Sequence, residues 1–201
     1  MLDVEKIVAM QNQTVDLWHR ERATNPYEGW MAIVCQQHQF NFQLWHQEDI
    51  ARSPDVSDSE IAQVKRNIDK LNQQRNDWIE RIDDYLTQYL EESSITAPAD
   101  ARSNSETVGS CVDRLSIMAI RIYHLQEQLD RDDVDEAHVS RVGQRLAICK
   151  LQQSDLAQCL SELMDDIRAM RKKHRVYRQF KMYNDPTLNP YLYQRQTRVA
   201  S

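Results

Sequence analysis

Two histidine–carboxylate pairs are the residues whose types and spacing suggest chemistry most directly. His46 precedes Asp49 by three positions, and His124 precedes Glu127 by the same interval. Residues three apart share one face of a helix, so each acid could orient its imidazole as a general base. Carboxylate-bridged metal bundles use the same spacing with the acid first. Because the order is reversed here and further carboxylate ligands cannot be assigned, we predict no metal site and name no cofactor. If a metal did bind, these four residues would be its ligands.

A run of mixed polar and aromatic residues surrounds the first pair. It reads NFQLWHQED from Asn41 to Asp49, and one helical face carries Asn41, Trp45, Glu48 and Arg52. Aromatic residues interleaved with charges are not typical of a solvated face, and polar groups held near a core need partners. A later segment offers such partners in Asp113, Arg114, Arg121 and Tyr123. We predict a polar pocket between the two segments, with Asp113 as a further catalytic candidate. The alternative is that these residues face solvent at helix edges.

The C-terminal segment is basic and rich in tyrosine. From residue 171 onward it has eight basic residues and one acidic residue, a net +7, so the rest of the chain carries −13 of the overall −6. Side chains of these types can bind phosphate and stack on rings, and Arg178, Lys181 and Tyr183 are the candidates. Alternatively, the segment folds back on the acidic part of the chain. Both interpretations hold if the docked tail forms one wall of the pocket.

The elements that must position these residues are helices. Apolar residues recur at three- and four-residue intervals, as in the seams of coiled coils, and helix-start signals lie at Pro26, Ser57, Ser103 and Asp133. Together they predict helices over residues 3–23, 27–52, 58–92, 105–130 and 134–175. We therefore expect an all-α, up-and-down bundle of about five long antiparallel helices. One domain would span 1–201, with an internal loop at 93–104 and a tail at 176–201 packed back on the bundle.

The glycine content supports this fold class. The 201 residues include only 3 glycines, where average usage gives about 14. Dinucleotide-binding and P-loop folds need glycine-rich phosphate loops, and β-sandwiches need glycine at turns, so all of these are excluded. Gly109 stands inside a predicted helix, one turn before Asp113, which indicates a close helix approach or room for a ligand.

Cysteine usage and the N-terminus bear on the compartment. The four cysteines, Cys35, Cys111, Cys149 and Cys159, form no CxxC motif, so we expect buried free thiols. The N-terminal residues carry acids and no long apolar run, unlike a signal peptide, and no segment approaches the roughly 18 apolar residues of a membrane span. We expect a cytoplasmic protein without a membrane span.

Three segments carry a resemblance to a known family. They are NFQLWHQEDIAR (41–52), NSETVGSCVDRLSIMAIRIYHLQEQ (104–128) and YRQFKMYNDPTLNPYLY (177–193). Together they resemble the bacterial family called domain of unknown function 4254. The resemblance implies a bacterial protein, and members encoded near glycosyltransferases of cell-surface heptose assembly suggest a link to surface-glycan metabolism. It implies no catalytic residue.

Three functions from different classes are compatible with these features. The first is binding of an anionic ligand, such as a nucleotide-sugar or sugar phosphate. Arginine suits bidentate phosphate binding, so Arg52, Arg114, Arg121 and Arg178 with Lys181 would hold phosphate while Trp45 and Tyr183 stack. The second is an enzyme in which His46 or His124 is the base, with or without a metal. The third is a structural or partner-binding bundle, including a homodimer. We do not expect nucleic-acid binding.

Overall fold

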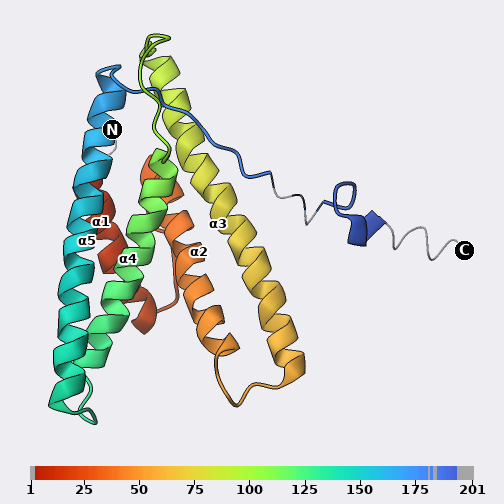
Figure 1. The fold of residues 1–201 in the computed structure, drawn as a ribbon, viewed down its shortest axis with the longest axis vertical. Coiled ribbons are helices and arrows are strands. Elements are labelled where there is room, and N and C mark those ends of the chain that lie inside the picture. The colour runs from red at the N-terminus through yellow and green to blue at the C-terminus, as the bar shows by residue number, and fades with distance from the viewer. Residues whose placement is uncertain (1–2, 181, 183–184, 194–201) are drawn as a thin grey trace, which may run out of the picture.

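The computed structural model describes residues 3–180, 182 and 185–193. Within these residues five long α-helices pack against one another: α1 (Val4–Arg20), α2 (Gly29–Ala51), α3 (Asp58–Glu92), α4 (Val108–Leu129) and α5 (Glu136–Arg168) (Figure 1). No β-strand occurs among them. The predicted all-α bundle is confirmed. None of the described helices combines the length and apolar character that crossing a membrane requires.

The helix ends follow local capping, and two of the predicted cap residues and the predicted end of α5 were wrong. Ser57 caps α3 as predicted, because its side chain accepts a hydrogen bond from the backbone N–H of Glu60. Thr107, and not Ser103, caps α4. Asp135, and not Asp133, caps α5. The end of α5 at Arg168 falls well before the predicted residue 175, since the backbone turns into a left-handed conformation at Met170 (φ 57°).

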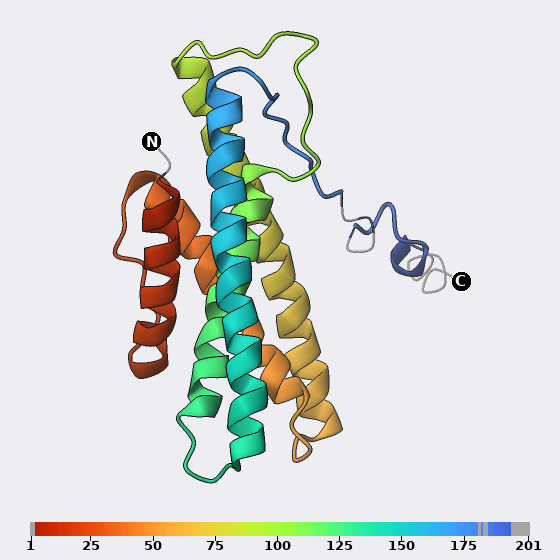
Figure 2. The same ribbon diagram turned by 60° about the vertical axis from the view of Figure 1, so that its left-hand side comes forward.

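The first two helices run in the same direction, unlike a strict up-and-down bundle. The α1 residues Gln11 and His19 lie beside the α2 residues His38 and His46, respectively, so both helices advance together. The extended segment 21–28 makes this possible by returning along α1 to the start of α2 (Figures 1 and 2). Gly29, at φ 54°, turns the chain into α2. From α2 onward the direction alternates, so α1, α2 and α4 are parallel (Figure 1).

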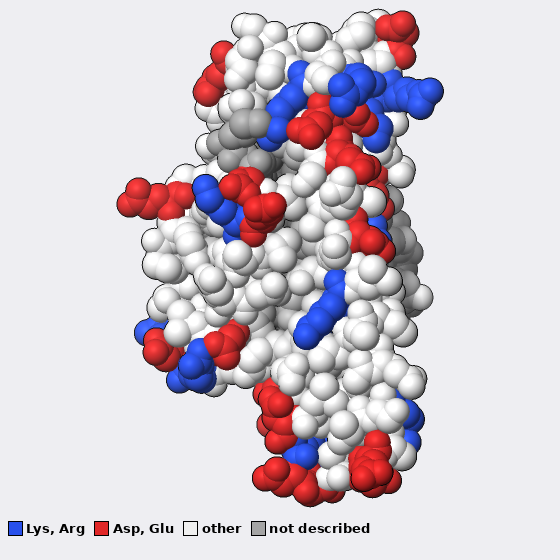
Figure 3. All heavy atoms as spheres, turned by 90° about the vertical axis from the view of Figure 1, so that its left-hand side faces the viewer, with Lys and Arg blue, Asp and Glu red and all other residues white. Residues whose placement is uncertain are grey.

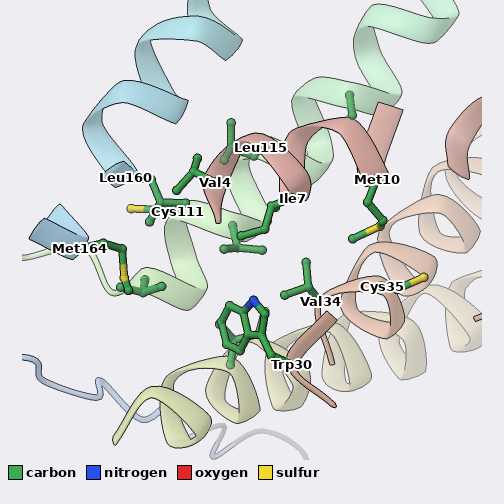
Figure 4. Packing of buried hydrophobic residues seen from close by; sticks show 14 of the residues in the cluster. Val4, Ile7, Met10, Trp30, Val34, Cys35, Cys111, Leu115, Leu160 and Met164 are labelled. Carbon is green, nitrogen blue, oxygen red and sulfur yellow. The ribbon is translucent and has the colours of Figure 1, made fainter. Parts of the chain in front are cut away.

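One apolar core joins all five helices. Ile7 of α1, Val34 of α2, Leu86 of α3, Leu115 of α4 and Leu160 of α5 are almost completely buried in it. Figure 4 shows Trp30, Met10, Cys35 and Cys111 in the same cluster. All four cysteines are free thiols, and three are buried as expected; Cys159 is exposed, because the side of α5 that carries it faces away from the core.

Gly109 marks a close approach of α4 to α3. A Cβ atom at this position would lie 2.4 Å from the carbonyl oxygen of Ile79. The backbone N–H of Gly109 also donates to the Asp83 carboxylate over 2.7 Å. Of the two sequence interpretations of this glycine, close helix approach is therefore the correct one.

The beginning of the tail docks on the bundle through polar contacts. The backbone N–H of Lys173 donates to Arg102 in the 93–107 connection, and Arg178 forms ion pairs with Glu80 and Asp84 of α3. The next aromatic residue, Phe180, is 87% exposed, and Tyr191 is 86% exposed. Figure 2 shows the described tail leaving the bundle on the α3 side. Hydrogen bonds and ion pairs, rather than aromatic packing, therefore attach residues 172–179.

Charged side chains do not merge into one patch on the face seen in Figure 3. Acidic and basic groups lie next to one another in separate clusters, with uncharged surface between them. Ion pairs within one helix, such as Asp16 with Arg20 on α1, bring opposite charges together. The excess negative charge of the bundle is thus distributed rather than gathered on this face.

Candidate functional site

A network of buried polar side chains crosses the centre of the bundle between α2 and α4. Asn41 of α2 donates from Nδ2 to Oδ1 of Asp113 at 2.9 Å and to Oγ of Ser116 at 2.8 Å. Gln37, one turn earlier on α2, donates to the same Asp113 oxygen at 2.6 Å. All four residues are buried. Because an unpaired buried carboxylate is very costly, these donors make the position of Asp113 in the core tolerable.

His38 belongs to this network as a neutral ring. Its Nε2 lies 3.1 Å from the carbonyl oxygen of Gln11, so this nitrogen must carry the proton. Its Nδ1 therefore accepts from the Ser116 hydroxyl at 2.6 Å. Complete burial lowers the pKa of His38 to about 3. A serine bonded to a histidine can act as a nucleophile, but both side chains have no exposed surface, so this pair is structural.

Arg75 brings α3 into the network. Its Nε donates to Oδ1 of Asp113 at 2.8 Å, and its Nη2 donates to Oδ2 at 2.5 Å. The Asp113 side chain is 6% exposed and that of Arg75 is 24% exposed. The hydrogen bonds from Arg75 to Asp113 raise the pKa of the guanidinium further above its ordinary value. This bidentate pair fixes the plane of the guanidinium at the edge of the core.

A pocket of about 400 Å³ opens beside the Asp113–Arg75 pair, between α2, α3 and α4. Asn41 and Arg75 supply its polar end. Most of the surface of its walls is apolar. Glu48 and Arg52, which also line it, form an exposed ion pair at 2.7 Å. The lining residues are Asn41, Leu44, Trp45, Glu48, Asp49, Arg52, Arg75, Ile117 and Ile120.

Three histidines from three parallel helices lie close together next to Trp45. The ring centres of His19 (α1), His46 (α2) and His124 (α4) lie 5.0–5.8 Å from one another, and each offers a nitrogen within 4.8 Å of the others. We call these residues the three-histidine cluster. The Trp45 ring stacks on His124 at 4.8 Å, and Tyr123 stacks on His19 at 4.1 Å.

Hydrogen bonds set the orientation of two of the three rings. His19 Nδ1 lies 2.7 Å from the carbonyl oxygen of Val15, and His124 Nδ1 lies 2.6 Å from Oε2 of Glu127. The Nε2 atoms of both rings are buried without a hydrogen-bond partner among the described residues. Burial, and then the two neighbouring histidines, lower the pKa of His46. Imidazoles in this arrangement are suited to hold a metal ion or to act as a base.

The other candidates from the sequence lie apart from the pocket. Arg114 and Arg121 are exposed and line a separate depression between α4 and α5, together with Asp155. Arg178 is paired on the outer side of α3. Lys181 and Tyr183 lie outside the described residues. The expected wall of basic tail residues over the pocket is therefore wrong for Arg178, because the acidic face of α3 holds it elsewhere.

The remaining candidates divide between the pocket and the cluster. Asn41, Trp45, Glu48, Asp49 and Arg52 line the pocket. Asp113 anchors Arg75 at its end, and Tyr123, His46, His124 and Glu127 form or contact the three-histidine cluster. Asp49, expected to orient His46, makes no hydrogen bond to it among the described contacts, whereas Glu127 orients His124 as expected.

Two residues of these sites were missed from the sequence. Arg75 is the one charged residue in an otherwise apolar seam of α3, and this interruption was a usable signal. His19 follows Trp18 near the end of α1 and has no motif around it. Only the parallel packing of α1 on α2 brings it to His46.

The fold and the buried polar centre define an all-α bundle protein with a pocket between α2, α3 and α4. The chain belongs to the family described as "Protein of unknown function (DUF4254)", whose model matches residues 31–176. The match includes α2 to α5 and both pairs that sequence analysis singled out, whereas α1 with His19 precedes it. Comparisons with curated proteins and with solved structures gave no match.

Proposed function

We propose that this protein binds a small organic ligand in the pocket between α2, α3 and α4, with an apolar or ring portion against Trp45 and one anionic group on Arg75. The observation that carries this proposal is the position of Arg75, held by Asp113 at the end of a mainly apolar pocket. Pockets for small molecules are typically apolar, with a few fixed polar groups that orient the ligand.

Arg75 has donors left for a ligand. A guanidinium carries five N–H donors, and Asp113 takes one from Nε and one from Nη2. No described residue accepts a hydrogen bond from the remaining N–H groups. Because Asp113 fixes the plane of the guanidinium, those N–H groups are preorganised, which lowers the entropy cost of binding a carboxylate or phosphate.

The charges of the lining limit the ligand. The lining contains two positive charges, on Arg52 and Arg75, and two negative charges, on Glu48 and Asp49. A third carboxylate, that of Asp113, is paired with Arg75. Because the positive charges do not exceed the negative ones, the pocket should bind a ligand with a single anionic group better than a diphosphate. Of the two ligand types expected from the sequence, a sugar monophosphate fits this pocket better than a nucleotide-sugar. A role in surface-glycan metabolism would require such a ligand.

A thermal-shift panel followed by calorimetry tests the proposal. The probes are phenyl phosphate, benzoate, nucleoside monophosphates, sugar monophosphates and nucleotide-sugars, with inorganic phosphate and phenol as half-ligands. We expect ring-containing monoanions or monophosphates to raise the melting temperature more than either half-ligand does. Substituting Leu44→Trp fills the pocket and should abolish the shift. Leu151→Trp places the same side chain on the exposed face of α5, where Leu151 is 62% exposed, and should leave the shift intact.

The panel also separates the alternatives. If no probe raises the melting temperature of the wild-type protein, the pocket does not bind this class of ligand and a structural or partner-binding role is favoured. If the shift survives Leu44→Trp, the ligand binds elsewhere, and the depression lined by Arg114 and Arg121 becomes the next site to test. Turnover of a bound probe would support the enzyme, for which the His124–Glu127 hydrogen bond provides an oriented base.

A further inference from the structure

We propose that His19, His46 and His124 form a binding site for a divalent transition-metal ion of the zinc type, which ties α1 to α2 and α4. None of the three histidines lines the pocket, although Trp45 contacts both sites, so metal binding can be tested independently of the proposed ligand. The proposal differs from the sequence analysis, which predicted no metal site. It also differs in the ligands, since His19 takes the place of the two acids, Asp49 and Glu127, that were considered there.

The hydrogen bonds of His19 and His124 select the tautomer that a metal requires. The carbonyl oxygen of Val15 can only accept, so His19 carries its proton on Nδ1 and presents the lone pair of Nε2. The carboxylate of Glu127 does the same for His124. Metal-ligating histidines almost always donate their other N–H to a carbonyl or carboxylate in this way, which fixes the ring and makes the ligating nitrogen more basic.

The two Nε2 atoms need a partner that the described residues do not provide. Both are buried without a hydrogen bond to any described residue. A buried polar atom without a partner is uncommon, because its desolvation is not compensated. For two such atoms in adjacent rings, each with its lone pair available, a shared cation is a simple explanation.

The distances are compatible with coordination after small ring movements. The candidate nitrogen atoms all lie within 4.8 Å of one another. Zinc–nitrogen bonds of 2.0–2.1 Å in a tetrahedral site place ligand atoms about 3.3 Å apart. The His46 ring makes no hydrogen bond to a described residue and can make most of this adjustment, while Val15 and Glu127 hold the other two rings.

The chemistry of the donor set indicates the kind of metal. Three imidazoles without a thiolate suit zinc, copper, nickel or iron rather than magnesium or calcium, which prefer oxygen ligands. Three protein ligands leave one tetrahedral position for water or a ligand, as in catalytic rather than structural zinc sites. The stacked rings of Tyr123 and Trp45 enclose the cluster on two sides.

The test is a zinc titration of full-length, untagged protein that has been stripped with a chelator. We expect one equivalent of Zn²⁺ to bind, measured by competition with a chromophoric chelator, and Co²⁺ to give the visible absorption of a tetrahedral site. Each of His19→Ala, His46→Ala and His124→Ala should weaken zinc binding at least tenfold. His138→Ala, in the first turn of α5 and outside the cluster, is the matched control and should bind as the wild type does.

A positioning role for Glu127 provides a second readout. Glu127→Ala keeps all three ligands but removes the acceptor that orients His124, so zinc affinity should fall about tenfold to a hundredfold. Hydrogen exchange of α1 should slow when zinc is added to the wild type and stay unchanged in His19→Ala. The proposal is overturned if the wild type binds less than one equivalent, or if affinity in the three histidine variants equals that of His138→Ala. If a variant fails to fold, the exchange measurement on the wild type still tests the proposal, because unchanged exchange of α1 on addition of zinc would contradict it.

Discussion

Asp113 on α4 holds Arg75 on α3 in a bidentate pair, with Nε to Oδ1 at 2.8 Å and Nη2 to Oδ2 at 2.5 Å. The same carboxylate accepts hydrogen bonds from Gln37 and Asn41 of α2. A single acid therefore connects three helices at the centre of the bundle. It also places a guanidinium at the end of the pocket between these three helices.

Removing the carboxylate of Asp113 should destabilise the fold strongly. In Asp113→Ala the guanidinium of Arg75, of which about a quarter is exposed, loses its partner, and two buried amides lose an acceptor. We expect the free energy of unfolding to fall by about 3 kcal/mol, as for other broken buried pairs. Urea denaturation measures this, with Asp165→Ala as the control, since Asp165 is 66% exposed in its pair with Arg168 and should cost less than about 1 kcal/mol. Equal losses in both variants would show that Asp113 has no special role.

Stability should depend on pH through His38. Its pKa is about 3 in the folded protein, where burial disfavours the charged ring, and 6.5 is its ordinary value. Between these values the unfolded chain binds a proton that the folded protein does not, so the free energy of unfolding falls as the pH is lowered from 6.5 toward 3. One such group contributes at most about 1.4 kcal/mol per pH unit.

Asp83 acts in the opposite direction over part of this range. Burial raises its pKa to about 6 from 3.8, so the folded protein retains a proton that the unfolded chain releases. The comparison of wild type with His38→Gln removes this contribution, because both proteins contain Asp83. The variant should lose less stability than the wild type between pH 6.5 and pH 4.5 in urea denaturation. Parallel pH profiles for the two proteins would contradict the neutral, buried state of His38.

The two glycines inside helices should respond oppositely to alanine. In Gly109→Ala the new Cβ meets the Ile79 carbonyl oxygen at 2.4 Å and the Asp83 carboxylate at 3.0 Å, so α3 and α4 must separate. We expect a loss of about 1–3 kcal/mol. In Gly143→Ala nothing lies within 4 Å, and the greater helix propensity of alanine should stabilise α5 by about 0.5–1 kcal/mol. Thermal and urea unfolding measure both, and a stabilising Gly109→Ala would rule out the close approach of α4 to α3.

The helical bundle could be predicted because its signals are local. Three- and four-residue periodicity along α3, α4 and α5 indicates long amphipathic helices, and Ser57 caps α3 where the sequence placed its start. The direction of α1 relative to α2 could not be predicted, because it depends on whether residues 21–28 form a tight turn or an extended return. No residue in that segment decides this on its own.

The sites could be predicted only where both partners stand in recognisable segments. Asn41 and Asp113 were candidates because they are polar residues within amphipathic helices, and in the structure Asn41 donates a hydrogen bond to Asp113. Arg114 and Arg121 share α4 with Asp113, but they point toward α5, since a helix distributes adjacent residues over different faces. His19 required the tertiary structure, because its relation to His46 exists only through the parallel packing of α1.

The most direct measurement of the central claim is a ¹⁵N NMR titration of the wild-type protein with phenyl phosphate, following the side-chain signals of Arg75 Nε–H and Trp45 Nε1–H. The account predicts that both signals shift together and saturate with phenyl phosphate, shift less with phenol or inorganic phosphate, and do not move in Leu44→Trp. If phenyl phosphate, benzoate and the monophosphates leave both signals unchanged in the folded wild-type protein, the pocket beside Asp113 and Arg75 is not a ligand site of this kind.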